Sequence, residues 1–215
     1  MHTIVDAMQA VQPKTRSRSV WASPWLKALV LLLCLTPLFV LAWWWWNQQL
    51  GWNRVEYVAR YTGIWTLRFL LLTLAITPLR RVPGLGNLIR FRRLLGLVTF
   101  FYATLHGLHY FAIDIQWNWP VLKEDLTIRR FFIAGFAAWL LMVPLAGTSF
   151  NAAIRWLGGR RWQWLHRLVY VSAALGVIHY LWQGKSIVIT PVVYGAVLLF
   201  LLMTRVVFFL EKQRT

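Results

Sequence analysis

The chain of 215 residues has few acidic side chains and a single cysteine. Asp and Glu together number 6, and all charged residues make up 13% of the sequence, about half of the roughly 25% usual in soluble domains. Cys34 alone cannot form an internal disulfide, hold an iron–sulfur cluster, build a zinc ribbon or complete a C-x-x-C-H haem attachment motif. The glycines form no G-x-G-x-x-G motif after a strand, so no dinucleotide-binding fold is predicted.

Apolar residues make up 59% of the chain, more than the interior of a soluble domain of this size can bury. The 15 Trp and 7 Tyr are typical of a chain that crosses the lipid–water interface many times. The net charge of +17 comes from short basic clusters between apolar runs, and no nucleic-acid-binding module is visible. The composition therefore predicts an integral membrane protein surrounded by lipid and argues against binding to nucleic acid.

The apolar runs predict an all-α bundle of transmembrane helices. A hydrocarbon core of about 30 Å needs roughly 20 helical residues. Six stretches meet or approach this length: 25–46, 63–79, 94–113, 131–147, 162–182 and 186–204. We expect one six-helix domain over residues 25–210, between a polar tail at 1–24 and a short tail at 211–215. The second stretch is short and contains Arg68.

The distribution of Lys and Arg predicts the orientation of these spans. Sixteen of these residues fall before the first span, in the second and fourth connections and after the sixth span, and six fall on the opposite side. Positive residues accumulate on the cytoplasmic side of a membrane protein. Both termini are therefore expected to be cytoplasmic.

Four of the five histidines lie in two of the predicted spans, namely His106 and His109 in the third, and His166 and His179 in the fifth. Counting from the cytoplasmic start of each span, His106 lies about 18 Å deep and His179 about 25 Å deep. Two neutral imidazoles at similar depth on neighbouring helices can hold a haem iron axially.

Two other roles for the histidines remain open. A histidine in a span can simply form a hydrogen bond to a neighbouring helix. A proton relay is also possible in principle, but such relays usually contain buried carboxylates, and Asp114 is the only acid close to the interior of a span. The residues alone favour haem ligation.

His166 lies near the cytoplasmic face, 13 residues before His179. On an ideal helix these two side chains are about 140° out of alignment. They face the same cleft only if the helix is kinked or bulged, and Gly176 lies between them. His166 is expected to serve a second cofactor on the inner side, either a loosely held haem, a flavin or a quinone. An interfacial histidine without a ligand is the alternative.

Arginines provide candidate partners for anionic groups. Arg68, inside a span, is a candidate for a haem propionate or a quinone. Arg92 and Arg93 belong to the basic connection before the third span. They can simply keep that connection in the cytoplasm, or they can pair with haem propionates or a flavin phosphate through bidentate hydrogen bonds.

Specific sequence stretches resemble a known family. The segments carrying the resemblance are RRLLGL at 92–97, YATLH at 102–106, RWQWLHRLVY at 161–170 and IHYLW at 178–182, with TG at 62–63 and ITPL at 76–79. In order and spacing they are similar to the haem-binding membrane subunit of the bacterial periplasmic methionine sulfoxide reductase system. That family belongs to the ferric-reductase-like transmembrane group of cytochromes b. The similarity covers roughly residues 50–205.

The resemblance implies b-type haem and FMN as cofactors, and the bacterial inner membrane as the location. It also implies that electrons pass from the quinone pool to a periplasmic molybdopterin-containing reductase, which carries the catalytic site. His106 and His179 match the family's haem ligands, and His166 matches a further motif histidine. His109 has no counterpart and is expected to pack or to form a hydrogen bond. Larger ferric reductases have a second histidine where this chain has Arg92 or Arg93.

Two rival functions were considered on sequence grounds. A stand-alone ferric or cupric reductase usually carries a fused FAD/NAD(P)H domain, and little sequence follows the last predicted span here. A proton-coupled transporter with a histidine relay is weakened by the scarcity of acids in the spans and by the lack of interrupted helices in repeated halves.

Overall fold

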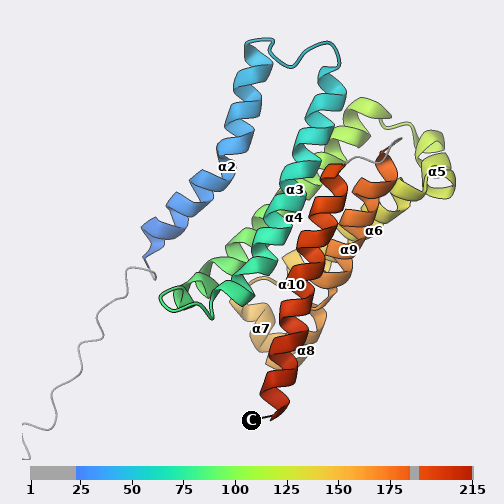
Figure 1. Ribbon diagram of the computed structural model, residues 1–215. Helices are drawn as coiled ribbons and strands as arrows, with labels where there is room; N and C mark the ends of the chain where they lie inside the picture. Colours follow the sequence, from blue (N-terminus) through green and yellow to red (C-terminus); the bar gives the residue numbers. More distant parts are fainter. Residues whose placement is uncertain (1–22, 185–188, 215) are drawn as a thin grey trace, which may run out of the picture.

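The computed structural model describes residues 23–184 and 189–214, and the regular structure of these residues is entirely helical. Figure 1 shows a bundle of long helices with shorter helices at its two ends. The elements in chain order are α2 (Pro24–Trp46), α3 (Arg54–Leu79), η2 (Gly86–Phe91), α4 (Arg92–His109), the π-helical turn η3 (Tyr110–Asp114), α5 (Trp119–Ile128), α6 (Arg130–Gly147), α7 (Asn151–Leu157), α8 (Gly159–Leu165), α9 (Leu168–Gln183) and α10 (Ile189–Arg214).

The bundle is built from two tightly packed helix pairs, α3 with α4 and α6 with α9. α10 packs against α9 and α3, and the three helices share a buried core of Leu67, Leu70, Leu71, Leu74, Ala173, Val177, Leu198 and Leu201. α2 lies at the edge of the bundle (Figure 1). Two tyrosine hydroxyls donate hydrogen bonds to its backbone, from Tyr102 to the Cys34 carbonyl at 2.8 Å and from Tyr61 to the Pro37 carbonyl at 3.1 Å.

The bundle has two chemically different ends, which are separated along the long helices (Figure 1). We call the end that carries the α3–α4 connection, α7, α8 and the last turns of α10 the basic end. We call the opposite end, with the α2–α3 connection, η3 and α5, the α5 end. Helix α2 begins at the basic end, and helix α10 ends there (Figure 1). The helices α2, α3, α4, α6, α9 and α10 run alternately toward one end and the other, which brings both ends of this part of the chain to the same side (Figure 1).

The all-helical membrane fold is confirmed, with one difference in the count of continuous spans. Among the residues that the structure describes, five helices are long and apolar enough to cross a bilayer, at Pro24–Trp46, Arg54–Leu79, Gly86–Asp114, Arg130–Gly147 and Ile189–Glu211. The fifth predicted span, 162–182, is divided into α8 and α9 by a turn at His166 and Arg167. α9 alone has 16 residues and is shorter than a full crossing. The break lies at His166 and not at Gly176, which is helical.

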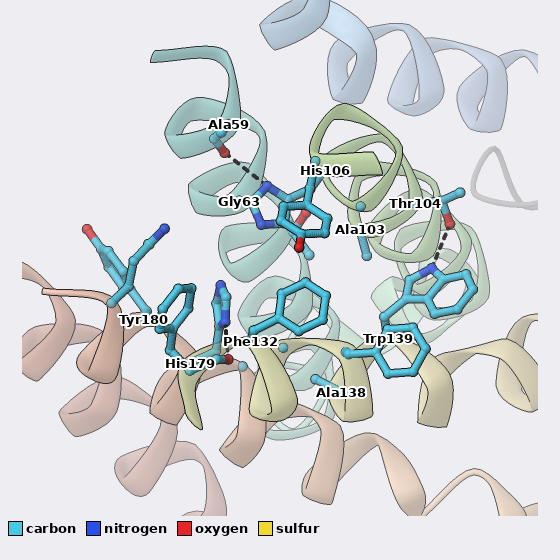
Figure 2. Close-up of a pocket in the computed structure, with 18 of the residues that line it drawn as sticks. Ala59, Gly63, Ala103, Thr104, His106, Phe132, Ala138, Trp139, His179 and Tyr180 are labelled. Carbon is cyan, nitrogen blue, oxygen red and sulfur yellow. Dashed lines mark hydrogen bonds between the residues drawn. The ribbon is translucent and has the colours of Figure 1, made fainter. Parts of the chain in front are cut away.

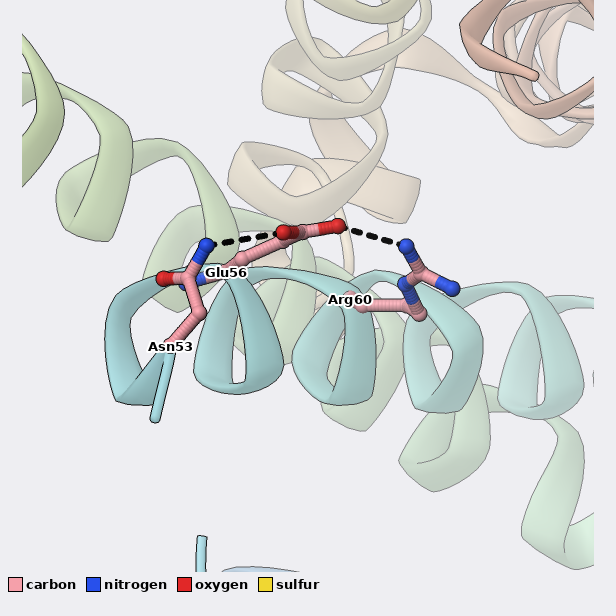
Figure 3. Close-up of polar contacts among 3 residues, drawn as sticks. All are labelled: Asn53, Glu56 and Arg60. Atoms are coloured by element: carbon pink, nitrogen blue, oxygen red, sulfur yellow. Dashed lines mark hydrogen bonds and ion pairs between the residues drawn. The ribbon is translucent and has the colours of Figure 1, made fainter. Parts of the chain in front are cut away.

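The second span begins earlier than expected, because α3 starts at Arg54 and not near Gly63. Polar residues made this segment look like a loop, yet they stabilise the first turns. The Asn53 side chain accepts a hydrogen bond from the Glu56 backbone N–H at 3.1 Å, as an N-cap residue does. Glu56 in turn forms an ion pair with Arg60 at 2.6 Å (Figure 3). The helix therefore extends well beyond its apolar part.

The other predicted boundaries need smaller corrections. α6 ends at Gly147, and the charge-free sequence after it forms the separate helix α7. α10 continues to Arg214, so most of the predicted tail at 211–215 is helical. Residues 186–188 of the sixth predicted span, Thr215 and most of the predicted tail at 1–24 lie outside the described residues.

Candidate functional site

A cavity lies among α3, α4, α6 and α9, in the half of the bundle toward the α5 end. Its volume is about 530 Å³, within the range of pockets that hold cofactors and other small molecules. His106 and His179 both line it, from α4 and α9. Its walls are mostly apolar and aromatic, and Figure 2 shows Phe132, Trp139 and Tyr180 around the two imidazoles. We call this space the His106–His179 cavity.

His106 is oriented by the neighbouring helix α3. Its Nδ1 lies 3.0 Å from the Ala59 carbonyl, and because a carbonyl can only accept, Nδ1 donates (Figure 2). The Thr62 hydroxyl lies 3.4 Å from the same nitrogen. The ring packs directly against Gly63 of α3, where a Cβ atom would come within 3.1 Å of the imidazole Cε1.

His179 is oriented in the same manner by α6. Its Nδ1 donates to the Phe131 carbonyl at 2.7 Å. The ring packs against Gly135, where a Cβ atom would lie only 2.5 Å from Nδ1. In both histidines the Nδ1–H is thus engaged by a backbone carbonyl. This fixes the tautomer whose Nε2 carries a free lone pair, the usual arrangement of a metal-ligating histidine.

The two imidazoles are placed as a pair of axial ligands would be. Their ring centres are 6.1 Å apart and their planes are inclined by 78°. A metal ion at about 2 Å from a nitrogen of each ring needs ring centres roughly 6 Å apart. Within residues 23–184 and 189–214, no three His, Cys, Asp or Glu side chains gather as a metal site. Two imidazoles without further protein ligands suit a metal that brings its other ligands with it, as haem iron does.

The end of this cavity toward α5 contains a buried carboxylate, Asp125, that sequence reasoning missed. Asp125 of α5 is 2% exposed. It accepts a hydrogen bond from the Tyr110 hydroxyl at 2.5 Å and pairs with Arg129 at 2.9 Å. All three residues line the cavity, together with Asp114 and Arg60. The sequence signal was weak, because Asp125 lies in the polar connection between the third and fourth predicted spans, outside every predicted span.

A second cavity of about 490 Å³ lies nearer the basic end and contains His166. Arg92, Arg93 and Arg167 also line it, which makes its surroundings strongly cationic. The ring of His166 stacks on Trp162 with 3.9 Å between ring centres. We call this space the His166 cavity.

The tautomer of His166 follows from its hydrogen-bond partners. The Thr148 hydroxyl donates to the Pro144 carbonyl at 2.7 Å, so its oxygen is left to accept. His166 Nε2 lies 3.1 Å from that oxygen and therefore donates to it. The free lone pair of His166 is consequently on Nδ1, whereas in His106 and His179 it is on Nε2.

The structure brings five of the six candidate residues into two cavities and leaves one outside. His106 and His179 share the first cavity, while His166, Arg92 and Arg93 share the second. Arg68 lines neither: its side chain is exposed, donates to the Tyr194 hydroxyl at 2.9 Å and lies over the Trp65 ring. The structure therefore does not place Arg68 beside the histidines.

His109 also lies apart from both cavities. Its Nε2 donates to the Val55 carbonyl at 2.9 Å. This hydrogen bond agrees with the packing or hydrogen-bonding role predicted for it.

Comparisons with known proteins agree with this architecture. Residues 62–177 match the family model described as ferric reductase like transmembrane component, and this segment contains His106, His109 and His166 and ends two residues before His179. The protein-methionine-sulfoxide reductase heme-binding subunit MsrQ of Ralstonia nicotianae is 47% identical over 201 residues, which is 93% of this chain and 90% of that protein. MsrQ of Azospira oryzae is 47% identical over 91% of this chain and 82% of its own length. MsrQ of Herminiimonas arsenicoxydans is 45% identical, with 87% of each chain covered.

The resemblance found in the sequence motifs therefore extends to nearly the whole chain. His106, one of the two facing imidazoles, lies inside the segment that matches the ferric-reductase-like model, and His179 lies two residues beyond its end. By identity and coverage, this chain belongs to the MsrQ family of protein-methionine-sulfoxide reductase heme-binding subunits.

Proposed function

We propose that this chain is a membrane cytochrome b that holds a b-type haem between His106 and His179 and passes electrons to a methionine sulfoxide reductase. The observation that carries the proposal is the facing pair of imidazoles, 6.1 Å between ring centres, in a cavity of about 530 Å³. The printed names of the relatives describe heme-binding subunits, which supports the same cofactor. A bound haem supplies reversible one-electron chemistry, and the protein supplies ligation and surroundings.

Different residues around this cavity would hold the iron, exclude water and bind a haem propionate. His106 and His179 present Nε2 toward the iron, because their Nδ1 atoms are engaged by the carbonyls of Ala59 and Phe131. The apolar and aromatic walls exclude water. Arg129, at the end of the cavity toward α5, is a candidate partner for a haem propionate.

The electron donor is proposed to bind in the His166 cavity, as a quinone or as flavin mononucleotide. The free lone pair of His166 is on Nδ1, and its Nε2–H is engaged by Thr148. A histidine whose Nδ1–H is bound to a carbonyl ligates haem iron through Nε2, and in His166 it is Nε2 that is already engaged. This tautomer therefore favours a hydrogen bond from His166 to an electron donor over ligation of a second haem. Arg92, Arg93 and Arg167 can pair with a flavin phosphate.

Electrons are proposed to travel from the basic end toward the α5 end. Leu70 and Met142 line both cavities, so a single layer of side chains separates the proposed donor site from the proposed haem site. The excess of Lys and Arg at the basic end supports a cytoplasmic location for both termini. The chain is then an inner-membrane protein whose α5 end faces the periplasm and a molybdopterin-containing reductase.

The haem proposal is tested by replacing each histidine in the purified, membrane-extracted protein. His106→Ala and His179→Ala should each lose most of the b-type absorption and pyridine haemochrome per mole of protein. His109→Ala is the matched control: it removes a histidine three residues after His106 on α4, outside both cavities. Full haem content in the His106 or His179 variant would remove that residue from the ligand pair. Absence of haem from the wild-type protein expressed with haem supply would refute the proposed function.

A further inference from the structure

Glycines face both histidines of the cavity in the same arrangement. Gly63 lies on α3 opposite His106, and Gly135 lies on α6 opposite His179. In each case the carbonyl that accepts the histidine Nδ1–H belongs to the residue four positions before the glycine, Ala59 or Phe131. In an α-helix, that carbonyl also accepts the glycine's own N–H. Each glycine thus follows its acceptor carbonyl by one helical turn, at the place where the imidazole lies against the helix.

We propose that Gly63 and Gly135 are positioning residues for the axial ligands: each leaves the space in which an imidazole reaches a helix carbonyl. This inference rests on the proposed haem site. It assigns to two glycines a role that neither sequence motif nor family membership gave them. The construction occurs independently in the two helix pairs, α3–α4 and α6–α9. His106 follows Gly63 by 43 residues and His179 follows Gly135 by 44, so the two halves are built alike.

Close approach is the physical reason why only glycine fits. A Cβ atom on Gly135 would lie 2.5 Å from Nδ1, 2.8 Å from Cε1 and 3.0 Å from Cγ of His179, far inside van der Waals contact. A Cβ atom on Gly63 would lie 3.1 Å from Cε1 of His106, which is a milder conflict. The ring of His179 cannot tilt away and keep its 2.7 Å hydrogen bond to Phe131. An added methyl group must therefore break the hydrogen bond or separate α6 from α9.

Other glycines of the bundle provide matched controls. A Cβ atom on Gly147, in the same helix as Gly135, would meet no atom within 4 Å, and Gly147 lines neither cavity. A Cβ atom on Gly96 of α4 would meet only the Thr73 methyl group at 3.8 Å, an ordinary contact. Gly96 lines the His166 cavity and not the His106–His179 cavity, so it is a control for haem content and potential and not for the rate of reduction. Alanine is a better helix former than glycine, so alanine at these control positions should not destabilise the bundle.

The test compares Gly135→Ala, Gly63→Ala, Gly147→Ala and Gly96→Ala in the full chain. Haem content is measured per mole of protein, the midpoint potential by redox titration, and helix content by circular dichroism. Loss of an outer hydrogen bond to a ligating histidine typically lowers metal affinity by about 10-fold to 100-fold. Gly135→Ala should show this loss most strongly and Gly63→Ala less, with helix content unchanged.

Any haem that remains in the two variants should have a higher midpoint potential than the wild type. An imidazole that no longer donates through Nδ1 is a weaker base, and a weaker base stabilises ferric iron less. The two control variants should match the wild type in haem content and potential. Wild-type haem content and potential in Gly135→Ala would overturn the inference, while the histidine variants test the proposed haem site separately. An equal loss in Gly135→Ala and Gly147→Ala would also overturn it, because the effect would then belong to the helix and not to the imidazole contact.

Discussion

The imidazole planes of His106 and His179 are nearly perpendicular, inclined by 78° with 6.1 Å between ring centres. Each plane is fixed by a hydrogen bond to a different helix, α3 for His106 and α6 for His179. The angle between the rings is therefore a property of how the two helix pairs pack, and it should persist when a ligand binds between them.

This angle predicts the magnetic signature of the oxidised protein. Perpendicular imidazole planes leave the two iron d-orbitals that interact with the rings close in energy. We expect a low-spin ferric EPR signal of the strongly anisotropic kind and not the rhombic kind given by parallel planes. The measurement is EPR at low temperature on the purified protein, with His109→Ala as the control. A rhombic signal, or a high-spin signal in fully loaded protein, would contradict the geometry.

The membrane fold and the depth of the histidines could be predicted from the sequence. Apolar runs set the helices, and counting residues from the start of each span placed His106 and His179 in the same half of the bilayer. Depth alone, however, does not say which faces of two helices meet. The rings meet because α3 pairs with α4 and α6 pairs with α9, and this pairing depends on long-range packing.

Two features of the candidate site were not visible in the sequence for physical reasons. The early start of α3 was missed because Glu56 and Arg60 are polar, and their mutual ion pair became visible only in the folded helix. The division of the fifth span was missed because a uniformly apolar and aromatic run does not show where a helix turns. The misalignment of His166 and His179 was the geometric sign visible in the sequence, and in the structure these two residues line different cavities.

The Asp125–Arg129 ion pair at the α5 end, whose carboxylate is buried, should contribute more to stability than the exposed Glu56–Arg60 pair. Asp125–Arg129 and Glu56–Arg60 are both separated by four residues, but the Asp125 side chain is 2% exposed and the Glu56 side chain is 56% exposed. Asp125→Ala leaves the Tyr110 hydroxyl without its acceptor and should lower the free energy of unfolding by about 1 to 3 kcal/mol. The Arg129 side chain is 55% exposed, so solvent screens the charge that is left unpaired. Glu56→Ala should cost about 1 kcal/mol or less. The free energies of unfolding of the two variants are compared by thermal or denaturant unfolding in detergent. An equal loss in both variants would show that burial of Asp125 does not strengthen its contribution to stability.

The identity of the reductant can be tested with the purified protein alone. The sequence has no dinucleotide-binding motif, and the two described cavities lie within the helix bundle. NADH alone should therefore fail to reduce the haem. A quinol, or NADH with a separate flavin reductase, should reduce it on the time scale of a stopped-flow experiment. The rate is followed at the α-band in a stopped-flow spectrophotometer. Rapid reduction by NADH in a sample verified to be free of flavin reductase would exclude the quinone or flavin route.

Replacement of His166 should separate the two cavities functionally. His166 lines only the cavity near the basic end, which Arg92 and Arg93 also line, and its Nε2 contacts Thr148. His166→Ala should therefore leave the absorption of the His106–His179 haem nearly intact and slow its reduction by quinol severalfold, because the donor loses a hydrogen-bonding partner. Haem per mole of protein and the reduction rate are measured together.

His109→Ala again serves as the control for this variant, because it removes a histidine outside both cavities. A wild-type reduction rate in His166→Ala would show that His166 is structural. Complete loss of haem from that variant would show that the haem is not confined to the His106–His179 cavity. A loss of half of the haem would identify His166 as the ligand of a second haem, and the tautomer argument for a flavin or quinone would then be wrong. Because Nε2 of His166 already donates to Thr148, we expect the first cavity to keep its full haem content and the reduction rate alone to change.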